Sequence, residues 1–132
     1  MIDLYSVDLT AATAQTIRWD VKSIQRGTSA TLDRDKTTIY LNAPGAYRVY
    51  VHGYGTTTAA GTFGFQLTGD GVDIVRGAAS MSTAAGAVGS VAFSTPIAVN
   101  RAAGVDKAAL SLVYTGGAGT ISLIEIGVEK VA

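Results

Sequence analysis

Apolar side chains recur at every second position along most of the chain, which is the period of a β-strand with one buried face. The clearest run is YRVYVHGY, residues 47–54, which follows a corner formed by Pro44 and Gly45. Similar runs occupy residues 62–68, 71–77, 89–95, 109–115 and 120–131. The pattern therefore predicts an all-β protein, with a short helical turn expected only within residues 8–17.

Segments rich in Gly, Ser, Thr and Ala separate these runs, and they occupy residues 55–61, 68–71, 82–89, 100–106 and 114–120. Many short strands with regular turn signals are typical of an antiparallel sandwich or barrel. The alternation places one set of large side chains in the core: Tyr47, Val49, Val51, Phe63, Phe65, Leu67, Val91, Phe93, Leu110, Leu112, Tyr114, Ile124, Ile126 and Val128. A chain of 132 residues favours one domain. We expect residues 1–13 to form an N-terminal arm or attachment segment and residues 14–132 to form the sandwich.

Some strands carry large groups on both faces. Tyr50, His52 and Tyr54 alternate with the inward row of their strand, so we expect them at a subunit interface. Leu123 and Ile124 are adjacent apolar residues where the alternation changes phase. A second buried surface would explain that change, and so would a β-bulge that needs no partner.

The composition excludes several classes of function. Ten basic and ten acidic residues give a net charge of zero, so no basic surface for nucleic acid or anionic lipid is predicted. No apolar stretch is long enough for a membrane span, and the N-terminus lacks the basic region of a signal peptide. The chain has no cysteine, which excludes disulfides and thiolate metal sites and fits synthesis in a reducing cytoplasm. Only 15% of residues are charged, which favours a surface partly covered by a partner over a monomer with a surface rich in Ser, Thr and Gly.

Candidate catalytic groups are scarce, so we expect a protein that is not an enzyme and needs no cofactor. The single histidine, His52, stands alone, and no nucleophile elbow, zinc-protease motif or phosphate-binding loop occurs. Glu125 and Glu129 stand roughly 13 Å apart along a strand, which is too far for a glycosidase pair. Asp70 and Asp73 flank an Asp-Gly pair, which suits a tight hairpin turn better than a calcium site.

Two further features have a structural and a functional interpretation. Trp19 is a candidate core or interface anchor, and a sugar-stacking platform is the weaker alternative. Together with Asp70 and Asp73 it forms a candidate ligand-contact set. The charged segment LDRDKTT, residues 32–38, is most simply a solvated turn.

The run APGAYRVYVHGYG, residues 43–55, resembles a strand of the complement-q and tumour-necrosis-factor type jelly rolls. In that family a Pro-Gly loop precedes a Tyr-bearing strand that carries a histidine. The order FGFQLTGDGVDI and then VGSVAFSTPIAVN is also similar, whereas the aromatic C-terminal motif of the family is missing. The resemblance implies a single-domain antiparallel jelly-roll β-sandwich that assembles as a homotrimer.

The opening MIDLYSVDLT and the closing GVEKV resemble small head-fibre or capsid-decoration proteins of tailed bacteriophages. This resemblance implies a homotrimer displayed on the virion and made in the bacterial host cytoplasm. Its partners would be further copies of the chain and the major capsid protein or a fibre stalk. The alternative is a receptor- or carbohydrate-binding knob that contacts a host surface glycan through Trp19 and the loops around Tyr54 and Asp70.

Overall fold

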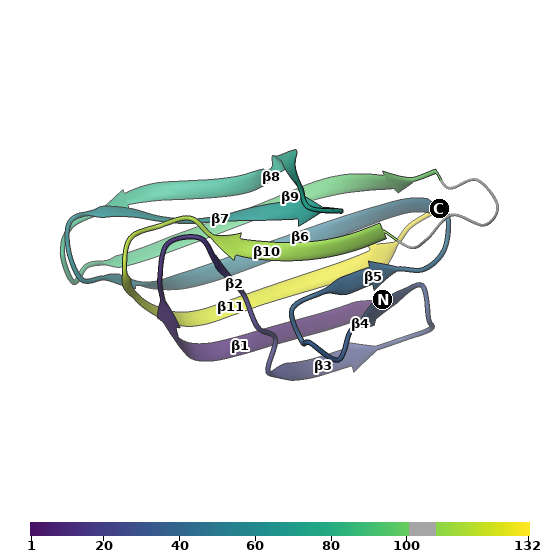
Figure 1. Ribbon diagram of the computed structural model, residues 1–132, viewed down its shortest axis with the longest axis horizontal. Helices are drawn as coiled ribbons and strands as arrows, with labels where there is room; N and C mark the ends of the chain where they lie inside the picture. The colour runs from purple at the N-terminus through teal and green to yellow at the C-terminus, as the bar shows by residue number, and fades with distance from the viewer. Residues whose placement is uncertain (101–107) are drawn as a thin grey trace.

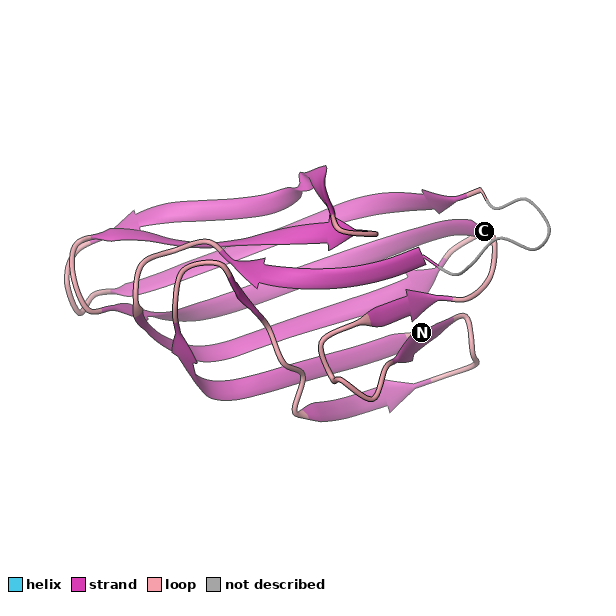
Figure 2. Cartoon of the chain, in the orientation of Figure 1, coloured by secondary structure: helices cyan, strands magenta, loops and turns pink. Residues whose placement is uncertain are grey.

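The computed structural model describes residues 1–100 and 108–132, and Figures 1 and 2 show these residues as strands joined by loops, with no helix. The predicted turn at residues 100–106 lies almost wholly outside the described residues. The strands form two stacked antiparallel sheets, which confirms the predicted all-β sandwich. Both chain ends lie at the same end of the sandwich (Figure 1).

The five-stranded sheet is built in the order β3-β1-β11-β6-β9. Its strands are β3 (Val21–Gln25), β1 (Ile2–Ala11), β11 (Gly119–Lys130), β6 (Gly45–Thr57) and β9 (Val88–Val99). The six-stranded sheet has the order β4-β5-β10-β7-β8, with β2 paired to β10 outside this path. Its strands are β4 (Ala30–Leu32), β5 (Ile39–Leu41), β10 (Ala108–Tyr114), β7 (Gly61–Gly69), β8 (Val72–Thr83) and β2 (Gln15–Thr16). Neighbouring strands are mostly distant in sequence, as jelly-roll connections require.

The inward row of each strand fills the space between the sheets, as the alternation predicts. Of the predicted core residues, all are buried except Phe93, which packs partly buried against the core. The rings of Phe63, Phe65 and Tyr114 meet edge to face, with centroids 5.4 to 5.7 Å apart. Gly53 lets the two sheets approach closely, because a Cβ there would lie 3.2 Å from Phe65 Cε2.

The predicted N-terminal arm is wrong, because the first residues form β1 inside the five-stranded sheet. Ile2 and Leu4 are fully buried, and β1 pairs with β11 over nine residues and with β3 on its other side. The alternation of Ile2, Leu4 and Ser6 gives this strand its buried face. The short helical turn expected in residues 8–17 is also wrong, since β1 continues to Ala11 and Ala14 has a φ of +66°.

The phase change near Leu123 is a β-bulge. Ile121 pairs with Gly55 and Leu123 pairs with the next residue of β6, Tyr54, so Ser122 is an extra residue in β11. The bulge keeps Ile121 and Ile124 in the core and turns Leu123 to the outer face. The bulge therefore explains why Leu123 and Ile124 are both apolar, and no subunit interface at Ile124 is needed.

The turn at residues 33–38 is the solvated hairpin that its charges predict. Asp33 N donates to Thr38 O at 2.9 Å, and the Asp35 carboxylate accepts hydrogen bonds from the amides of Thr37 and Thr38. The bond from Thr37 is the largest of the interactions that hold the pKa of Asp35 below its ordinary value. The ionised Asp35 carboxylate thus stabilises the turn locally.

Candidate subunit interface

The candidate interface residues Tyr50, His52 and Tyr54 all lie on the outer face of the five-stranded sheet. Their strand, β6, buries Tyr47, Val49 and Val51 on its other face, as the alternation predicts. Tyr50 and Tyr54 are 46% and 40% exposed, and about half of the His52 side chain is accessible. Two half-exposed tyrosines in a central strand leave a large apolar area in water.

The strand register extends this outer face into rows that run across neighbouring strands of the sheet. One row joins Val7, Leu123, Tyr54 and Ser90. The next joins Val21, Tyr5, Glu125, His52 and Ala92, and a third joins Ile24, Asp3, Gly127, Tyr50 and Ser94. We call the surface made by these three rows the β6 face. Its exposed apolar residues, with Met1 at one border and Val88 at the other, gather on one side of the sandwich: Met1, Val7, Val21, Ile24, Tyr50, Tyr54 and Val88.

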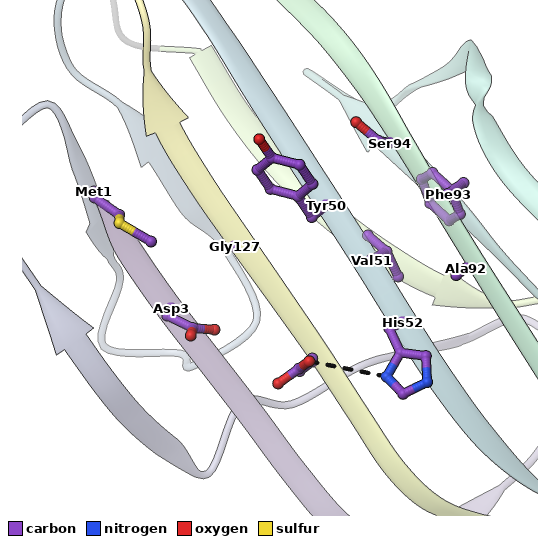
Figure 3. A pocket seen from close by; sticks show the side chains of 10 residues that line it. Met1, Asp3, Tyr50, Val51, His52, Ala92, Phe93, Ser94 and Gly127 are labelled. Atoms are coloured by element: carbon purple, nitrogen blue, oxygen red, sulfur yellow. Dashed lines mark ion pairs between the residues drawn. The ribbon is translucent and has the colours of Figure 1, made fainter.

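A hollow of about 520 Å³ lies in the β6 face, and we call it the Gly127 hollow. Gly127 forms its floor because this outward position of β11 has no side chain, while Tyr50 and Asp3 stand on the flanking strands (Figure 3). His52, Glu125 and Phe93 also line it. Sequence reasoning identified Tyr50 and His52 but missed Asp3, Glu125 and Gly127 as parts of one site. The available signal was Gly127 itself, a glycine at an outward strand position two residues after Glu125.

The charges in the hollow are mainly acidic. His52 Nδ1 lies 3.8 Å from Glu125 Oε1 across the β6–β11 ladder (Figure 3). Among the described residues no basic side chain lies within 4 Å of the Asp3 carboxylate. Both members of the His52–Glu125 pair are half exposed, so the pair contributes little to stability on its own. The β6 face is therefore an apolar surface with an acidic centre.

The candidate ligand-contact residues Trp19, Asp70 and Asp73 do not form one site. Trp19 is only 1% exposed and belongs to the core, which agrees with the anchor interpretation and removes it as a surface contact. Ser6 fixes it there, because its hydroxyl accepts from Asp20 N at 2.8 Å and donates to Arg18 O. In the described part of the chain, Trp19 Nε1 has no hydrogen-bond partner.

Asp70 belongs to a tight turn between β7 and β8. Asp70 and Gly71 both have positive φ, +52° and +82°, as a two-residue hairpin turn requires. The Asp70 carboxylate accepts a hydrogen bond from Ala109 N at 2.9 Å, so it is used within the fold. Asp73 lies on β8 beside a different hollow, on the outer face of the six-stranded sheet. Within the described ranges no three His, Asp or Glu side chains gather as metal ligands, and no helix is long and apolar enough to cross a membrane.

Comparison with solved structures identifies the fold. The globular domain of zebrafish complement 1qA protein aligns with 99% of this chain and 96% of its own, with a TM-score of 0.65 and 10% identity. Murine APRIL at pH 5.0 gives a TM-score of 0.67 at 12% identity, covering 98% of each chain. Eiger TNF from S. frugiperda gives 0.62 at 16% identity, covering 99% of this chain and 92% of its own.

The fold is the TNF/C1q-like jelly roll. The resemblance read from residues 43–55 is thus confirmed at the level of the fold. No protein-family model matches the chain, and no curated protein sequence is significantly similar to it. Identities of 10 to 16% carry the fold alone.

Proposed function

We propose that this protein is a structural protein that works by assembling into a homotrimer through the β6 face. The observation that carries the proposal is the concentration of exposed apolar side chains, with Tyr50 and Tyr54 at its centre, on one face of the five-stranded sheet. Contiguous exposed apolar surface marks interaction sites in soluble proteins. The TNF/C1q-like fold is often trimeric, which supports three copies as the number.

The place of action that we propose is the virion of a tailed bacteriophage. There the trimer would be a capsid-decoration or head-fibre protein, made in the cytoplasm of the bacterial host. The support is the resemblance of the opening and closing segments, together with the low proportion of charged residues. Because residues 2–11 form β1, they are not free to serve as an arm that attaches the trimer to a capsid protein or a fibre stalk.

The assembly is tested by measuring the solution mass by light scattering coupled to size exclusion. A homotrimer of 13.5 kDa chains has a mass of about 40 kDa. We expect that mass for the unchanged protein and a monomer mass for the double variant Tyr50→Ala with Tyr54→Ala. Val113→Ala, on the outer face of the six-stranded sheet, is the matched control and should remain trimeric. A monomeric unchanged protein would overturn the proposal.

The virion role is tested by incubating purified trimer with capsids that lack it and measuring co-sedimentation. Saturable binding in a fixed ratio to the capsid protein supports decoration. Absence of binding to capsids, combined with binding to host cells, would support a receptor-binding knob instead. We also expect no turnover of host surface glycans, because the described residues offer one histidine and no cluster of catalytic carboxylates.

One observation favours the carbohydrate-binding alternative. A shallow hollow of about 310 Å³ on the outer face of the six-stranded sheet is lined by Thr13, Gln66, Asp73 and Thr115, among others. Hydroxyl, amide and carboxylate groups of this kind can hydrogen-bond sugar hydroxyls. Screening the trimer against immobilised glycans, with Asp73→Ala as the matched variant, tests this function separately from assembly. Loss of a glycan signal in the variant would favour the carbohydrate-binding alternative.

A further inference from the structure

Strand β8 carries a protrusion at the edge of the six-stranded sheet. Thr68 pairs with Asp73 and Gln66 pairs with Ala78, so a single residue of β7, Leu67, faces four residues of β8. We call residues 74–77 the β8 knob. The Gln66 side chain holds its base, because Nε2 donates to Ile74 O at 2.9 Å. The knob is therefore a supported feature of the fold and not a frayed end.

The two side chains at the tip of the β8 knob point into solvent. Val75 is 97% exposed, the largest exposed fraction among the large apolar residues described. Arg76 is also exposed, and no described carboxylate lies within 4 Å of its guanidinium. One role of such a protrusion is to block pairing with another chain at a free sheet edge. An apolar side chain beside an exposed cation is also the complement of the Gly127 hollow, which offers Tyr50 beside the carboxylates of Asp3 and Glu125.

The knob and the hollow stand at the same level along the strands. A Cβ on Gly55 would lie 3.0 Å from Phe63 Cε2, and one on Gly53 would lie 3.2 Å from Phe65 Cε2. Moving two residues back along β6 therefore corresponds to moving two residues forward along β7. One further step of this kind places Leu67, and the β8 knob that faces it, at the level of Val51. Tyr50, Val51 and His52 line the hollow. Rotation about an axis parallel to the strands preserves level, so such a rotation can bring the knob of one copy to the hollow of another.

We propose that, in the homotrimer, the β8 knob of each copy docks into the Gly127 hollow of the next copy. Arg76 pairs with Asp3 and Glu125, and Val75 packs against Tyr50. This contact joins two different surfaces, so it is heterologous and closes into a ring under three-fold rotation. The inference rests on the proposed homotrimer and adds the residue pairs that hold it together.

Charge reversal tests the pairing through the concentration at which the trimer dissociates. We expect Arg76→Glu, and separately Asp3→Lys, to raise that concentration at least about ten-fold, since close interfacial charge pairs couple strongly. Combining Arg76→Glu with Asp3→Lys should restore most of the loss. Arg34→Glu is the control, because Arg34 is also exposed but lies in the 33–38 turn. Circular dichroism and thermal unfolding establish that each variant is folded.

Cross-linking tests the same contact without changing its charge, because the chain has no cysteine of its own. A mixture of Val75→Cys and Ser94→Cys chains, exchanged and treated with a short bis-maleimide, should give covalent dimers that pair the two variants. Neither variant alone should cross-link to itself, and Val75→Cys mixed with Arg34→Cys should not cross-link.

The outcomes separate this inference from the proposed function. If Arg76→Glu stays trimeric with unchanged dissociation while Tyr50→Ala with Tyr54→Ala dissociates, the knob only protects the sheet edge and the docking is overturned, but the trimer stands. If the unchanged protein is monomeric, both the docking and the proposed homotrimer are overturned. A charge-reversal loss that the double variant restores, together with the mixed cross-link, supports the docking.

Discussion

Tyr50 and Gly127 lie directly opposite one another in the ladder between β6 and β11. A Cβ added to Gly127 would meet only Tyr50 Cδ2, at 3.7 Å, which is an ordinary van der Waals distance. The glycine is therefore not required for the backbone or for packing inside the protomer. What it provides is the floor of the hollow beside the tyrosine.

This relationship predicts that Gly127 can be replaced without loss of the fold. Gly127→Ala should leave the thermal unfolding temperature unchanged or slightly raised, because glycine weakens a strand interior. Gly127→Leu should also fold but should fill the hollow and weaken the trimer. Gly119→Ala is the contrasting variant, because its Cβ would collide with Thr56 O of β6 and cost about 1–3 kcal/mol. Unfolding temperatures and solution masses of the three variants check the prediction. Equal loss of stability at the two glycines would contradict it.

Trp19 is predicted to be a stability residue and not a ligand contact. Trp19→Ala should lower the free energy of unfolding by about 3–5 kcal/mol, because it empties a buried site of a large ring. Ser6→Ala should cost about 1–3 kcal/mol, since it leaves Arg18 O and Asp20 N without their hydroxyl partner. Denaturant unfolding measures both. A folded Trp19→Ala protein with unchanged stability but lost glycan binding would favour the sugar platform.

The turn between β7 and β8 is predicted to depend on glycine and not on calcium. Gly71→Ala should destabilise the protein by about 1–2 kcal/mol, because Gly71 has a φ of +82°. Calcium at millimolar concentration should not change the unfolding temperature of the unchanged protein, because the Asp70 carboxylate is already bonded to Ala109 N. A calcium-dependent rise that Asp70→Asn and Asp73→Asn abolish would contradict the turn interpretation.

The 33–38 turn is predicted to weaken in acid. The pKa of Asp35 is lowered from 3.8 in the folded protein, chiefly by the Thr37 amide, so the carboxylate contributes stability above the unfolded pKa. That contribution is lost as pH falls below 3.8 and through the lower folded pKa. Asp35→Asn should therefore reduce the slope of unfolding temperature against pH in this acid range. Following the amide signals of Thr37 and Thr38 by NMR locates the effect, and identical slopes in the two proteins would contradict it.

Alternation along the chain is enough to predict the fold class and most of the core. Strict alternation in residues such as Tyr47, Val49 and Val51 fixes which face is buried, because neighbouring side chains of a strand point to opposite sides. The same rule places Tyr50 and Tyr54 on the outer face. The Asp70-Gly71 turn was also readable, because positive φ has a local residue preference.

Which outward residues meet depends on how the strands pair. Asp3, Gly127 and Tyr50 are far apart in the chain and become neighbours only through the β1–β11–β6 register, which no local pattern specifies. Residues 2–11 likewise form a strand because the fold places β11 beside them. Trp19 is buried because the fold packs the core around it. Alternation is a property of one strand and survives in the sequence. A surface made by several strands exists only after those strands have paired.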